Sequence, residues 1–574
     1  MSQHAAPRSA HPGQGPAKPL GAALGALATL ALLAQALGVL AAPAAGRAQE
    51  DAIRLQLLAV NDFHGALETV PRTSDGRPVG GAAVMAAYLD QREAQAAAEG
   101  AASLRVGAGD LIGASPLVSG LLRDEPTILA LSQMRLRYSS VGNHEFDKGV
   151  AELRRLQYGG CAPPKGTGFF QSSADPAALD PATGCFRGAT FQYLAANVID
   201  DATGEPLFPP YAVEQVEGVP VGFIGVVLKE TPAIVVPSGV AGVRFLDEAA
   251  TINRYVAELR QQGVRAIVVL IHQGGQGARD GGAIRGAIVP IVEALDPEVD
   301  VVVSGHTHQF YQGTIAGKLV TQAGSYSQGF ADVRLTLDRA TGDVAAKRAE
   351  IVDTLADEPP GNAPDPAIGA LVASAAAQTA PLANRLIGQA AANVTRSQTP
   401  AGESALGDLV ADAQRAAMGT QVAFMNPGGL RTDLRAGPVT YADLFAVQPF
   451  GNSLVRMELS GAQIVQLLEQ QWIDQPAPRM LQVSGIAYAW QPERPVGQRV
   501  DPADVRIGGQ PLALDQAYSV VVNSFLAEGG DNFTVLRDGT ARVGGPPDVD
   551  ALVDYLARLP RPFSAATDGR IQTR

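Results

Sequence analysis

The architecture of this chain follows from Ala266-Ile-Val-Val-Leu-Ile-His272, an uninterrupted apolar run that ends in a histidine. A second run, Val299–Val303, is followed directly by Ser304-Gly-His-Thr-His308. Continuous Val and Ile runs that alternate with helical segments are typical of strands buried on both faces of a sheet. The pattern therefore predicts an α/β protein built of packed layers.

Three further segments combine a short apolar strand with a polar loop. They are Ile53–Val60 before Asn61-Asp-Phe-His-Gly65, Leu104–Ala108 before Gly109-Asp110, and Tyr138–Val141 before Gly142-Asn-His-Glu-Phe-Asp147. Helices are predicted between the strands, over Gly80–Glu99, Glu125–Arg135, Glu248–Gln262 and Ala283–Leu295. Ligands of such sheets bind beyond the carboxyl ends of the strands, so we expect the polar loops to form one site.

The length of 574 residues is too great for one ordinary core and predicts two domains after a leader. Glu358-Pro-Pro-Gly-Asn-Ala-Pro364 interrupts the pattern, and an Ala-rich connector helix is expected after it. Shorter strands and helices then predict a smaller, mixed α/β C-terminal domain. The expected parts are a leader at 1–50, the layered domain at 52–355, the linker with its connector helix at 356–386, the C-terminal domain at 387–562 and a tail at 563–574.

Residues 1–50 have the composition of an export signal. Two basic residues precede the uncharged segment Gly21–Ala42, and cleavage points follow at Ala44 or Ala48. A retained membrane anchor is the alternative, because the apolar segment can cross a bilayer at about 20 residues. We expect cleavage, no later spanning segment, no membrane association afterwards, and a periplasmic or secreted protein.

The two cysteines, Cys161 and Cys185, flank a loop rich in Gly, Pro, Ser and Thr. In an exported protein such an even pair predicts a disulfide. Closing a loop of about 25 residues would stabilise the fold by on the order of 3 kcal/mol through chain entropy.

The net charge of −13 bears on possible partners. It argues against a protein that tracks nucleic-acid phosphates, so no nucleic-acid polymer is expected as a partner. A negatively charged small substrate would have to be attracted by local cations or metal ions.

The histidines gather at predicted strand ends. Of seven in the chain, His4 and His11 lie in the leader, and the other five follow apolar runs. A stable core rarely needs imidazole, so these five predict a metal site. With nearby carboxylate and amide oxygens, the donor set suits two borderline divalent ions such as Zn²⁺ or Mn²⁺ better than Mg²⁺ or Ca²⁺ alone. The candidate ligands are Asp62, His64, Asp110, Asn143, His272, His306 and His308.

His144 and Asp147, three residues apart in one loop, are candidates for an imidazole–carboxylate pair that stabilises a phosphoryl group or its leaving oxygen. Taken singly, some ligands have plainer explanations: Asp110 as a helix N-cap, Asn143 as a turn residue, His272 as a satisfied histidine at a sheet edge. Their joint occurrence favours the metal site.

These motifs resemble those of calcineurin-like metallophosphoesterases. With the second domain, their order resembles the secreted bacterial 5′-nucleotidase/UDP-sugar hydrolase family over nearly all of residues 52–562. The resemblance implies an αββα metallophosphoesterase domain and two metal ions. One departure is His308, where members often have Gln or Asn; imidazole there should bind a borderline metal more tightly. The resemblance assigns one ion to Asp62, His64, Asp110 and His308, the other to Asp110, Asn143, His272 and His306, and the catalytic dyad to His144 and Asp147.

The resemblance gives the second domain a nucleotide-recognition role. A glycine turn precedes Arg431 in the segment Asn426-Pro-Gly-Gly-Leu-Arg431. The guanidinium of Arg431 is suited to bidentate hydrogen bonding with phosphate. Taken singly, Phe450 and Phe525 are interpreted as core or hinge residues. The resemblance matches them to the family's pair of aromatic residues that stack on the base, an interaction of roughly 1–3 kcal/mol per base. Arg396 is the nearest candidate for arginines that the family places before Glu403-Ser-Ala-Leu-Gly407. The implied nucleotide contacts are Asn426, Arg431, Asn452 and Asp531.

The implied function is an exported two-metal phosphohydrolase that releases phosphate from nucleoside 5′-monophosphates and extends to nucleotide sugars. The closest alternative, a 2′,3′-cyclic-nucleotide phosphodiesterase/3′-nucleotidase, shares the metal motifs, but Asp147 and the segment around Phe450 favour the 5′-nucleotidase. An alternative of another class is a non-catalytic exported binder of nucleotide or metal, which the His144–Asp147 pair disfavours. We expect a monomer.

Overall fold

The computed structural model describes residues 52–71, 76–161 and 179–574. Residues 53–574 form one compact unit, and the domain boundaries predicted within it stay predictions. The predicted leader lies outside the described residues.

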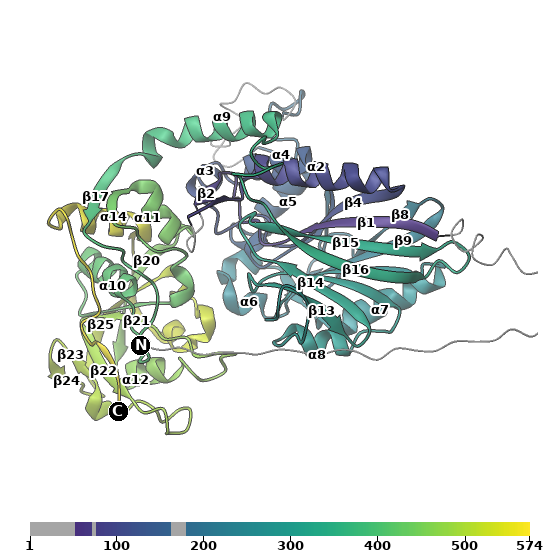
Figure 1. Cartoon of the computed structure of the whole chain (residues 1–574). Helices are drawn as coiled ribbons and strands as arrows, with labels where there is room; N and C mark the ends of the chain where they lie inside the picture. The colour runs from purple at the N-terminus through teal and green to yellow at the C-terminus, as the bar shows by residue number, and fades with distance from the viewer. Residues whose placement is uncertain (1–51, 72–75, 162–178) are drawn as a thin grey trace, which may run out of the picture. The chain divides into compact units, whose positions relative to one another are not determined.

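The first large sheet has six strands in the order β16-β15-β1-β4-β5-β6 (Figure 1). Neighbours from β1 to β6 are parallel, so the loops that follow β1, β4 and β5 leave the sheet at one edge. The strands are β1 (Ala52–Val60), β4 (Ala101–Ala108), β5 (Leu136–Ser140), β6 (Gln192–Leu194), β15 (Gly329–Asp338) and β16 (Val344–Asp353).

The second sheet also has six strands, in the order β13-β14-β12-β11-β9-β8. β9, β11 and β12 are parallel, which brings the ends of β11 and β12 to one edge as well. The strands are β8 (Tyr211–Val216), β9 (Val219–Val227), β11 (Ala266–His272), β12 (Val299–Ser304), β13 (Phe310–Ile315) and β14 (Lys318–Ala323).

Alternation of side chains along each strand builds the layers. On β11, Val268 and Leu270 join the core that the two sheets share, whereas Ile267, Val269 and Ile271 lie on the opposite face. Both faces are buried, so no polar residue is needed within the strand. This explains the uninterrupted apolar run in the sequence.

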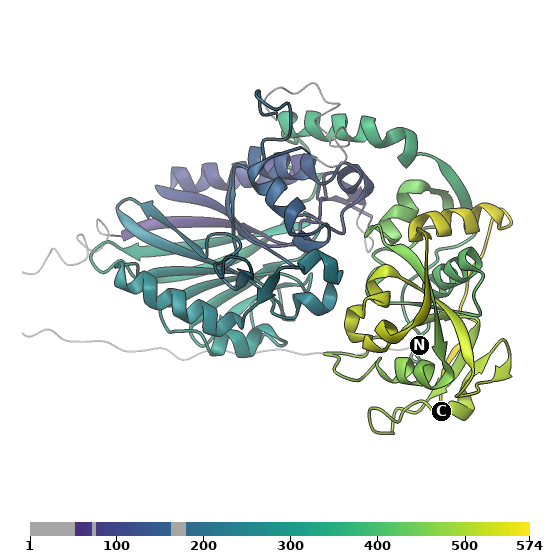
Figure 2. The ribbon, with the colours of Figure 1, turned by 180° about the vertical axis from the view of Figure 1, so that it is seen from behind.

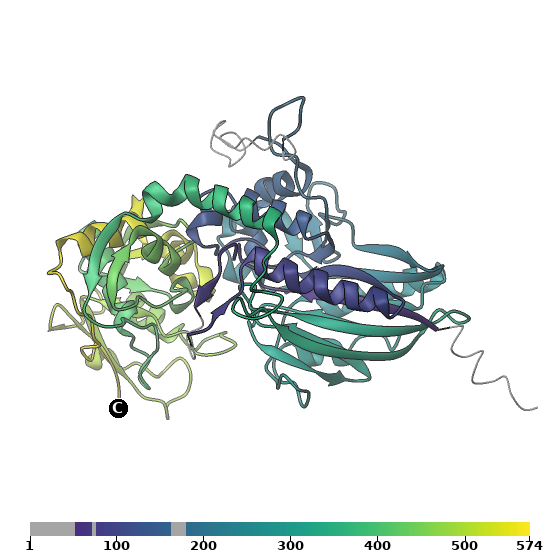
Figure 3. The same cartoon turned by 45° about the horizontal axis from the view of Figure 1, so that its top comes forward.

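Helices cover the outer face of each sheet, and the order of layers is helix, sheet, sheet, helix (Figures 1 and 2). The predicted αββα layering is therefore confirmed. One predicted helix is wrong in extent: α8 covers six residues rather than the whole of 283–295, because Gly286 at φ 105° breaks the helical conformation before it. Figure 3 shows α2 along the first sheet. The helices are α2 (Ala82–Ala98), α4 (Glu125–Gln133) and α5 (Val150–Tyr158) on the first sheet, and α7 (Glu248–Gln261) and α8 (Ile288–Glu293) on the second.

The predicted connector helix is α9 (Pro366–Ala383). Asp365 caps it by accepting a hydrogen bond from the Ile368 amide, as an N-cap carboxylate does. Among the described helices, α9 alone is long and apolar enough to cross a membrane by length and composition, so the expectation of no such segment beyond the leader is wrong. Ile368, Leu371 and Ala375 of α9 are nevertheless buried in a core that also includes residues of α2 and α4.

The C-terminal part is mixed α/β, as predicted. Its five-stranded sheet has the order β21-β18-β25-β20-β26 and separates two cores. The strands are β18 (Val422–Met425), β20 (Ser453–Ser460), β21 (Gln482–Ser484), β25 (Ala517–Asn523) and β26 (Thr540–Pro547), and the main helices are α10 (Ala405–Met418), α11 (Tyr441–Val447), α12 (Gly461–Glu469) and α14 (Asp548–Arg558).

The last residues, expected to be a tail, pack against the rest of this part. Strand β27 (Ile571–Thr573) pairs in parallel with β22 (Ile486–Trp490). Phe563 and Ile571 are both buried, in the two cores on either side of the five-stranded sheet. The chain end therefore contributes to the core.

The predicted disulfide is confirmed. Cys161 and Cys185 are bonded, with their Cα atoms 4.8 Å apart.

Candidate active site

Loops from both large sheets meet at the carboxyl ends of their strands. The ring of His272, at the end of β11, forms a hydrogen bond through Nδ1 with the carbonyl of Ala108, at the end of β4 (2.8 Å). The amide of His306, after β12, donates to Oδ1 of Asp62, after β1 (2.9 Å). The parallel strands thus bring residues about 160 to 240 positions apart into one site.

Asp62, His64 and His308 form the first group of donors, with ligand atoms all within 4.8 Å of one another. Nε2 of His64 lies 3.1 Å from Nε2 of His308. Nε2 of His308 lies 3.4 Å from Oδ1 of Asp62. Asp62 and His64 are fully buried, so their donor atoms face one another rather than solvent.

Asp110, His272 and His306 form the second group, again within 4.8 Å. Nε2 of His272 lies 3.0 Å from Oδ2 of Asp110, and Nδ1 of His306 lies 3.0 Å from Oδ1 of Asn143. The same Oδ2 of Asp110 is 3.6 Å from Nε2 of His64 in the first group. Asp110 therefore stands between the two groups, where a bridging carboxylate would lie.

The donor atoms fit a pair of divalent ions. His64 contacts the carbonyl of Gly113 through Nδ1 (2.9 Å), as His272 contacts Ala108, and each contact leaves Nε2 as the ligand atom. Nε2 of His272 is buried and has no hydrogen bond within the described part of the chain. Nε2 instead lies beside Oδ2 of Asp110, and such a set of buried nitrogen and oxygen donors without sulfur suits borderline metals such as Zn²⁺ or Mn²⁺.

Most of these residues have a strained backbone. A positive φ is uncommon for residues other than glycine, and it persists where the surrounding structure enforces it, typically at functional sites. It occurs at Asp62 (48°), His64 (47°), Asp110 (49°), His306 (75°) and His308 (55°).

Gly142 lets the loop after β5 approach Asp110. A Cβ atom at Gly142 would lie 2.1 Å from Oδ1 of Asp110 and 2.4 Å from its amide nitrogen. No side chain fits there, so glycine is required by the close approach.

Glu145 holds the same two loops together, and its role was not predicted from the sequence. Its carboxylate accepts hydrogen bonds from the amides of Asp110 (2.9 Å) and Leu111 (2.8 Å), and from the Tyr193 hydroxyl (3.2 Å). Burial, together with the charge of Asp110, raises the pKa of Glu145 to about 7. No sequence signal distinguishes this carboxylate from its neighbour Asp147.

His144 and Asp147 form the predicted pair. Nδ1 of His144 lies 2.9 Å from Oδ2 of Asp147, and the His144 amide donates to Oδ1 of Asp110 (2.9 Å). Burial lowers the pKa of His144, but the carboxylates of Asp147 and Asp110 outweigh it, and the pKa lies above its usual value. The ring is thus oriented and favours the protonated form that can donate to an oxygen.

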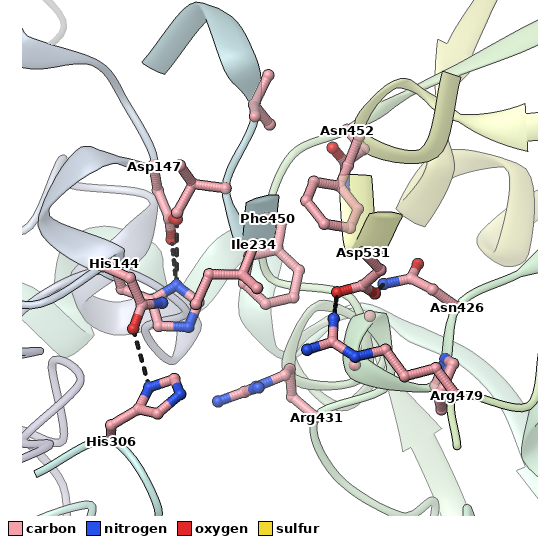
Figure 4. Close-up of a pocket in the computed structure, with 17 residues that line it drawn as sticks. His144, Asp147, Ile234, His306, Asn426, Arg431, Phe450, Asn452, Arg479 and Asp531 are labelled. Carbon is pink, nitrogen blue, oxygen red and sulfur yellow. Dashed lines mark hydrogen bonds and ion pairs between the residues drawn. The ribbon is translucent and has the colours of Figure 1, made fainter. Parts of the chain in front are cut away.

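A cavity of about 240 Å³ adjoins the dyad (Figure 4). His144, Asp147, Asn143 and His306 line one side of it. The structure brings all six predicted nucleotide contacts into the remaining wall: Asn426, Arg431, Phe450, Asn452, Phe525 and Asp531.

The aromatic residues of the cavity are in contact with charged or polar groups. Phe450 stacks on His144, with ring centroids 5.5 Å apart and planes at 18°. The guanidinium of Arg431 lies over the same ring of Phe450, 5.7 Å from its centroid. Phe525 is buried, and Gly530 packs so closely on its ring that a Cβ there would lie 2.4 Å away.

Arg479 lines the cavity although the sequence did not identify it. It forms an ion pair with Asp531, whose Oδ2 also accepts a hydrogen bond from Asn426 (2.9 Å). Arg396, the candidate from the sequence, does not line this cavity; its guanidinium donates to the carbonyl of Leu430 (3.1 Å). Three apolar residues of the wall were also missed: Ile234, Val235 and Val236.

The chain is similar to several known proteins. Residues 382–538 match the family described as 5′-nucleotidase, C-terminal domain. The chain is 35% identical over 536 residues to endonuclease YhcR of Bacillus subtilis, covering 92% of this chain but only 41% of YhcR. It is also 35% identical over 550 residues to cell wall protein Lmo0130 of Listeria monocytogenes, covering 89% of this chain and 68% of that protein.

A solved structure extends the likeness to the whole fold. The crystal structure of a 5′-nucleotidase precursor from Thermus thermophilus matches with a TM-score of 0.74 at 31% identity. The match covers 91% of this chain and 99% of the Thermus chain, so both the layered domain and the C-terminal part are included. The chain belongs to the 5′-nucleotidase family.

Proposed function

We propose that this chain is a metal-dependent phosphohydrolase that releases phosphate from nucleoside 5′-monophosphates and extends to nucleotide sugars. The observation that carries the proposal is the shared cavity. His144 and Asp147, beside the two donor groups, open into the same space as Phe450 and Arg431. Phosphate and base would therefore be held in one pocket by different parts of the chain.

The two donor groups are the proposed metal site. One ion would be held by Asp62, His64 and His308, the other by His272, His306 and Asn143, with Asp110 between them. Two divalent ions there would supply the polarisation of a phosphoryl oxygen and an activated water near neutral pH.

The chain's own side chains orient the phosphate and the leaving group. Asp147 holds the His144 ring through Nδ1, which leaves the opposite nitrogen to donate to an oxygen of the ester. Arg431 is always cationic, and its guanidinium lies in the cavity wall (Figure 4). Its terminal nitrogens would donate to an oxyanion of the substrate.

Phe450 and Phe525 are the proposed base clamp, with Asn426, Asn452 and Asp531 as polar contacts to the nucleoside. Aromatic rings stack on any base, so this pair would bind nucleotides without strong base preference. Asp531 would offer its carboxylate to sugar hydroxyls, and its contacts with Asn426 and Arg479 hold it in the cavity wall.

The protein is proposed to act outside the cytoplasm, as a monomer in the periplasm or after secretion. The Cys161–Cys185 disulfide and the cell-wall relative support export.

A panel of substrates tests the function. With Zn²⁺ or Mn²⁺ supplied, we expect faster phosphate release from AMP than from 3′-AMP or 2′,3′-cyclic AMP, and no cleavage of single-stranded DNA. Preference for the cyclic ester would favour the phosphodiesterase alternative, and cleavage of DNA would favour an activity like that named for YhcR. Full metal occupancy with no hydrolysis of any substrate would support a non-catalytic binder.

A further inference from the structure

A second cluster of carboxylates lies at the start of α10, and none of its members lines the proposed active-site cavity. Glu403, Asp408 and Asp568 each present an oxygen, and these oxygens all lie within 4.8 Å of one another. Glu403 and Asp408 are each only 2% exposed, whereas Asp568 is at the surface. The cluster is therefore a buried pair of acids with one solvent-facing acid beside it.

Glu403 anchors the end of the chain. Its Oε1 accepts hydrogen bonds from the amides of Asp568 (2.9 Å) and Gly569 (3.0 Å), and its Oε2 accepts one from Ile571 (3.1 Å). Glu403 thus holds the backbone at the place where the chain enters strand β27.

Asp408 lies beside Glu403, and its nearest cation is the guanidinium of Arg570. Neither of its carboxylate oxygens accepts a hydrogen bond from any described residue, although both are buried. Burial, and the nearby carboxylate of Glu403, raise its pKa to about 8 against the opposing effect of Arg570. An ionised carboxylate without hydrogen bonds is costly to bury, and a cation held between Asp408 and Glu403 would offset that cost.

Arg570 does not supply that charge by direct contact. Its terminal nitrogens bind both oxygens of Asp412, at 2.7 and 2.9 Å. Its Nε donates to Asp568 (2.8 Å) and stays 3.9 Å from Oδ2 of Asp408, too far for a hydrogen bond. The guanidinium is engaged by Asp412 and Asp568, so it forms no hydrogen bond with Asp408.

We propose that Glu403, Asp408 and Asp568 bind a hard divalent cation of the Ca²⁺ type, which fastens strand β27 to α10. An all-oxygen, all-carboxylate donor set selects a hard ion, in contrast to the nitrogen-rich donor groups of the active site. Oxygens this close together can share an ion at about 2.4 Å from each. The exposed Asp568 provides the path of entry and leaves room for water ligands.

The test is Ca²⁺ binding by the full chain, measured by isothermal titration calorimetry and by thermal unfolding after EGTA treatment. We expect Ca²⁺ to raise the melting temperature of the wild type, because an ion that binds the folded chain stabilises it. Asp408→Asn should lose one bound Ca²⁺ per chain and the thermal shift. Asp515→Asn, which removes an exposed carboxylate of the same part, should behave as the wild type.

Asp568→Asn is the second variant, since its side chain is exposed and its loss should not impair folding. It should weaken Ca²⁺ binding by at least about tenfold, because affinity follows the number of charged ligands. Equal Ca²⁺ stoichiometry and thermal shift in the wild type and both variants would overturn the proposal. So would a wild type that ignores Ca²⁺ while Asp408→Asn is more stable in EGTA, which would indicate a shared proton instead. AMP hydrolysis is measured separately, since these residues lie outside the active-site cavity.

Discussion

Nε2 of His272 lies 3.0 Å from Oδ2 of Asp110, although the two residues end strands of different sheets. The same oxygen is 3.6 Å from Nε2 of His64, so one carboxylate stands between both donor groups. Asp110 is held there by the amide of His144 on Oδ1 and by its own amide on Glu145. A change that displaces Asp110 should therefore disturb both groups together.

Gly142→Ala is such a change, because its Cβ would overlap Oδ1 and the amide of Asp110. We expect metal content to fall at both positions and kcat/KM for AMP to drop by about 10²-fold, as expected for a misplacement of about 1 Å. Metal analysis and phosphate release measure this. Gly544→Ala is the control, because no atom lies within 4 Å of the added Cβ. Full metal content and activity in Gly142→Ala would show that Asp110 tolerates displacement.

His144→Ala should keep the metals and lose rate. His144 belongs to neither donor group, and its ring is oriented by Asp147. Loss of one acid–base group lowers kcat by roughly 10²- to 10⁴-fold. Asp147→Asn should have a smaller effect in the same direction, because the ring remains but loses its carboxylate. The idea fails if His144→Ala loses the metals or keeps its rate.

Replacing Phe450 and Phe525 together with Ala should weaken nucleotide use selectively. Stacking of roughly 1–3 kcal/mol per base corresponds to about a 5- to 150-fold rise in KM for AMP. Hydrolysis of glycerol phosphate, which has no ring to stack, is the internal control and should change little. The same control shows whether His144 still functions once Phe450, which stacks on its ring, has been removed. An equal fall with both substrates would contradict the clamp.

Asp300 should make the fold less stable as pH rises. Burial raises its pKa to about 6 in the folded chain against its ordinary value of 3.8, although Lys347 partly opposes this. Between these values the folded state binds more protons than the unfolded state, so stability declines as pH rises. Relative to Asp300→Asn, the wild type should lose on the order of 2–3 kcal/mol between pH 4 and pH 7.

Urea unfolding of metal-free protein at both pH values measures the Asp300 effect, with Asp515→Asn as an exposed control. An unchanged difference between wild type and Asp300→Asn across this range would show that Asp300 ionises normally in the fold.

The layered domain and its donor groups could be predicted because the candidate metal ligands follow apolar strands directly in the sequence. Val268 and Leu270 face one core and Ile267 and Val269 the other, which makes the buried strand continuous and easy to recognise. His272 then ends the run where a parallel strand reaches the edge of the sheet. Polar residues at the ends of apolar runs also identified the loops after β1, β4, β5 and β12.

Strands with mixed polar and apolar faces were harder to predict. β15 and β16 pair antiparallel, and on β16 the exposed residues Arg348 and Glu350 alternate with less exposed ones. Such segments lack the long apolar run of β11. The extent of α8 was also not predicted. Gly286 has a positive φ that prevents an earlier start of the helix, and the hydrophobic pattern does not show this.

Residues that act through other residues left no sequence signal. Glu145 binds backbone amides of a loop 34 or 35 positions away, and Arg479 reaches the cavity by pairing with Asp531. Arg396 was preferred because it precedes Glu403 in the chain, but chain order does not decide which guanidinium faces the cavity. Tertiary packing determines these contacts.

The most direct measurement compares metal content and phosphate release from AMP in the wild type and Asp110→Ala. The account predicts about two Zn²⁺ or Mn²⁺ ions per wild-type chain with active hydrolysis, and loss of both ions together with activity in Asp110→Ala. A wild type that binds its ions yet releases no phosphate from AMP, or an Asp110→Ala variant that keeps its ions and its rate, would contradict it.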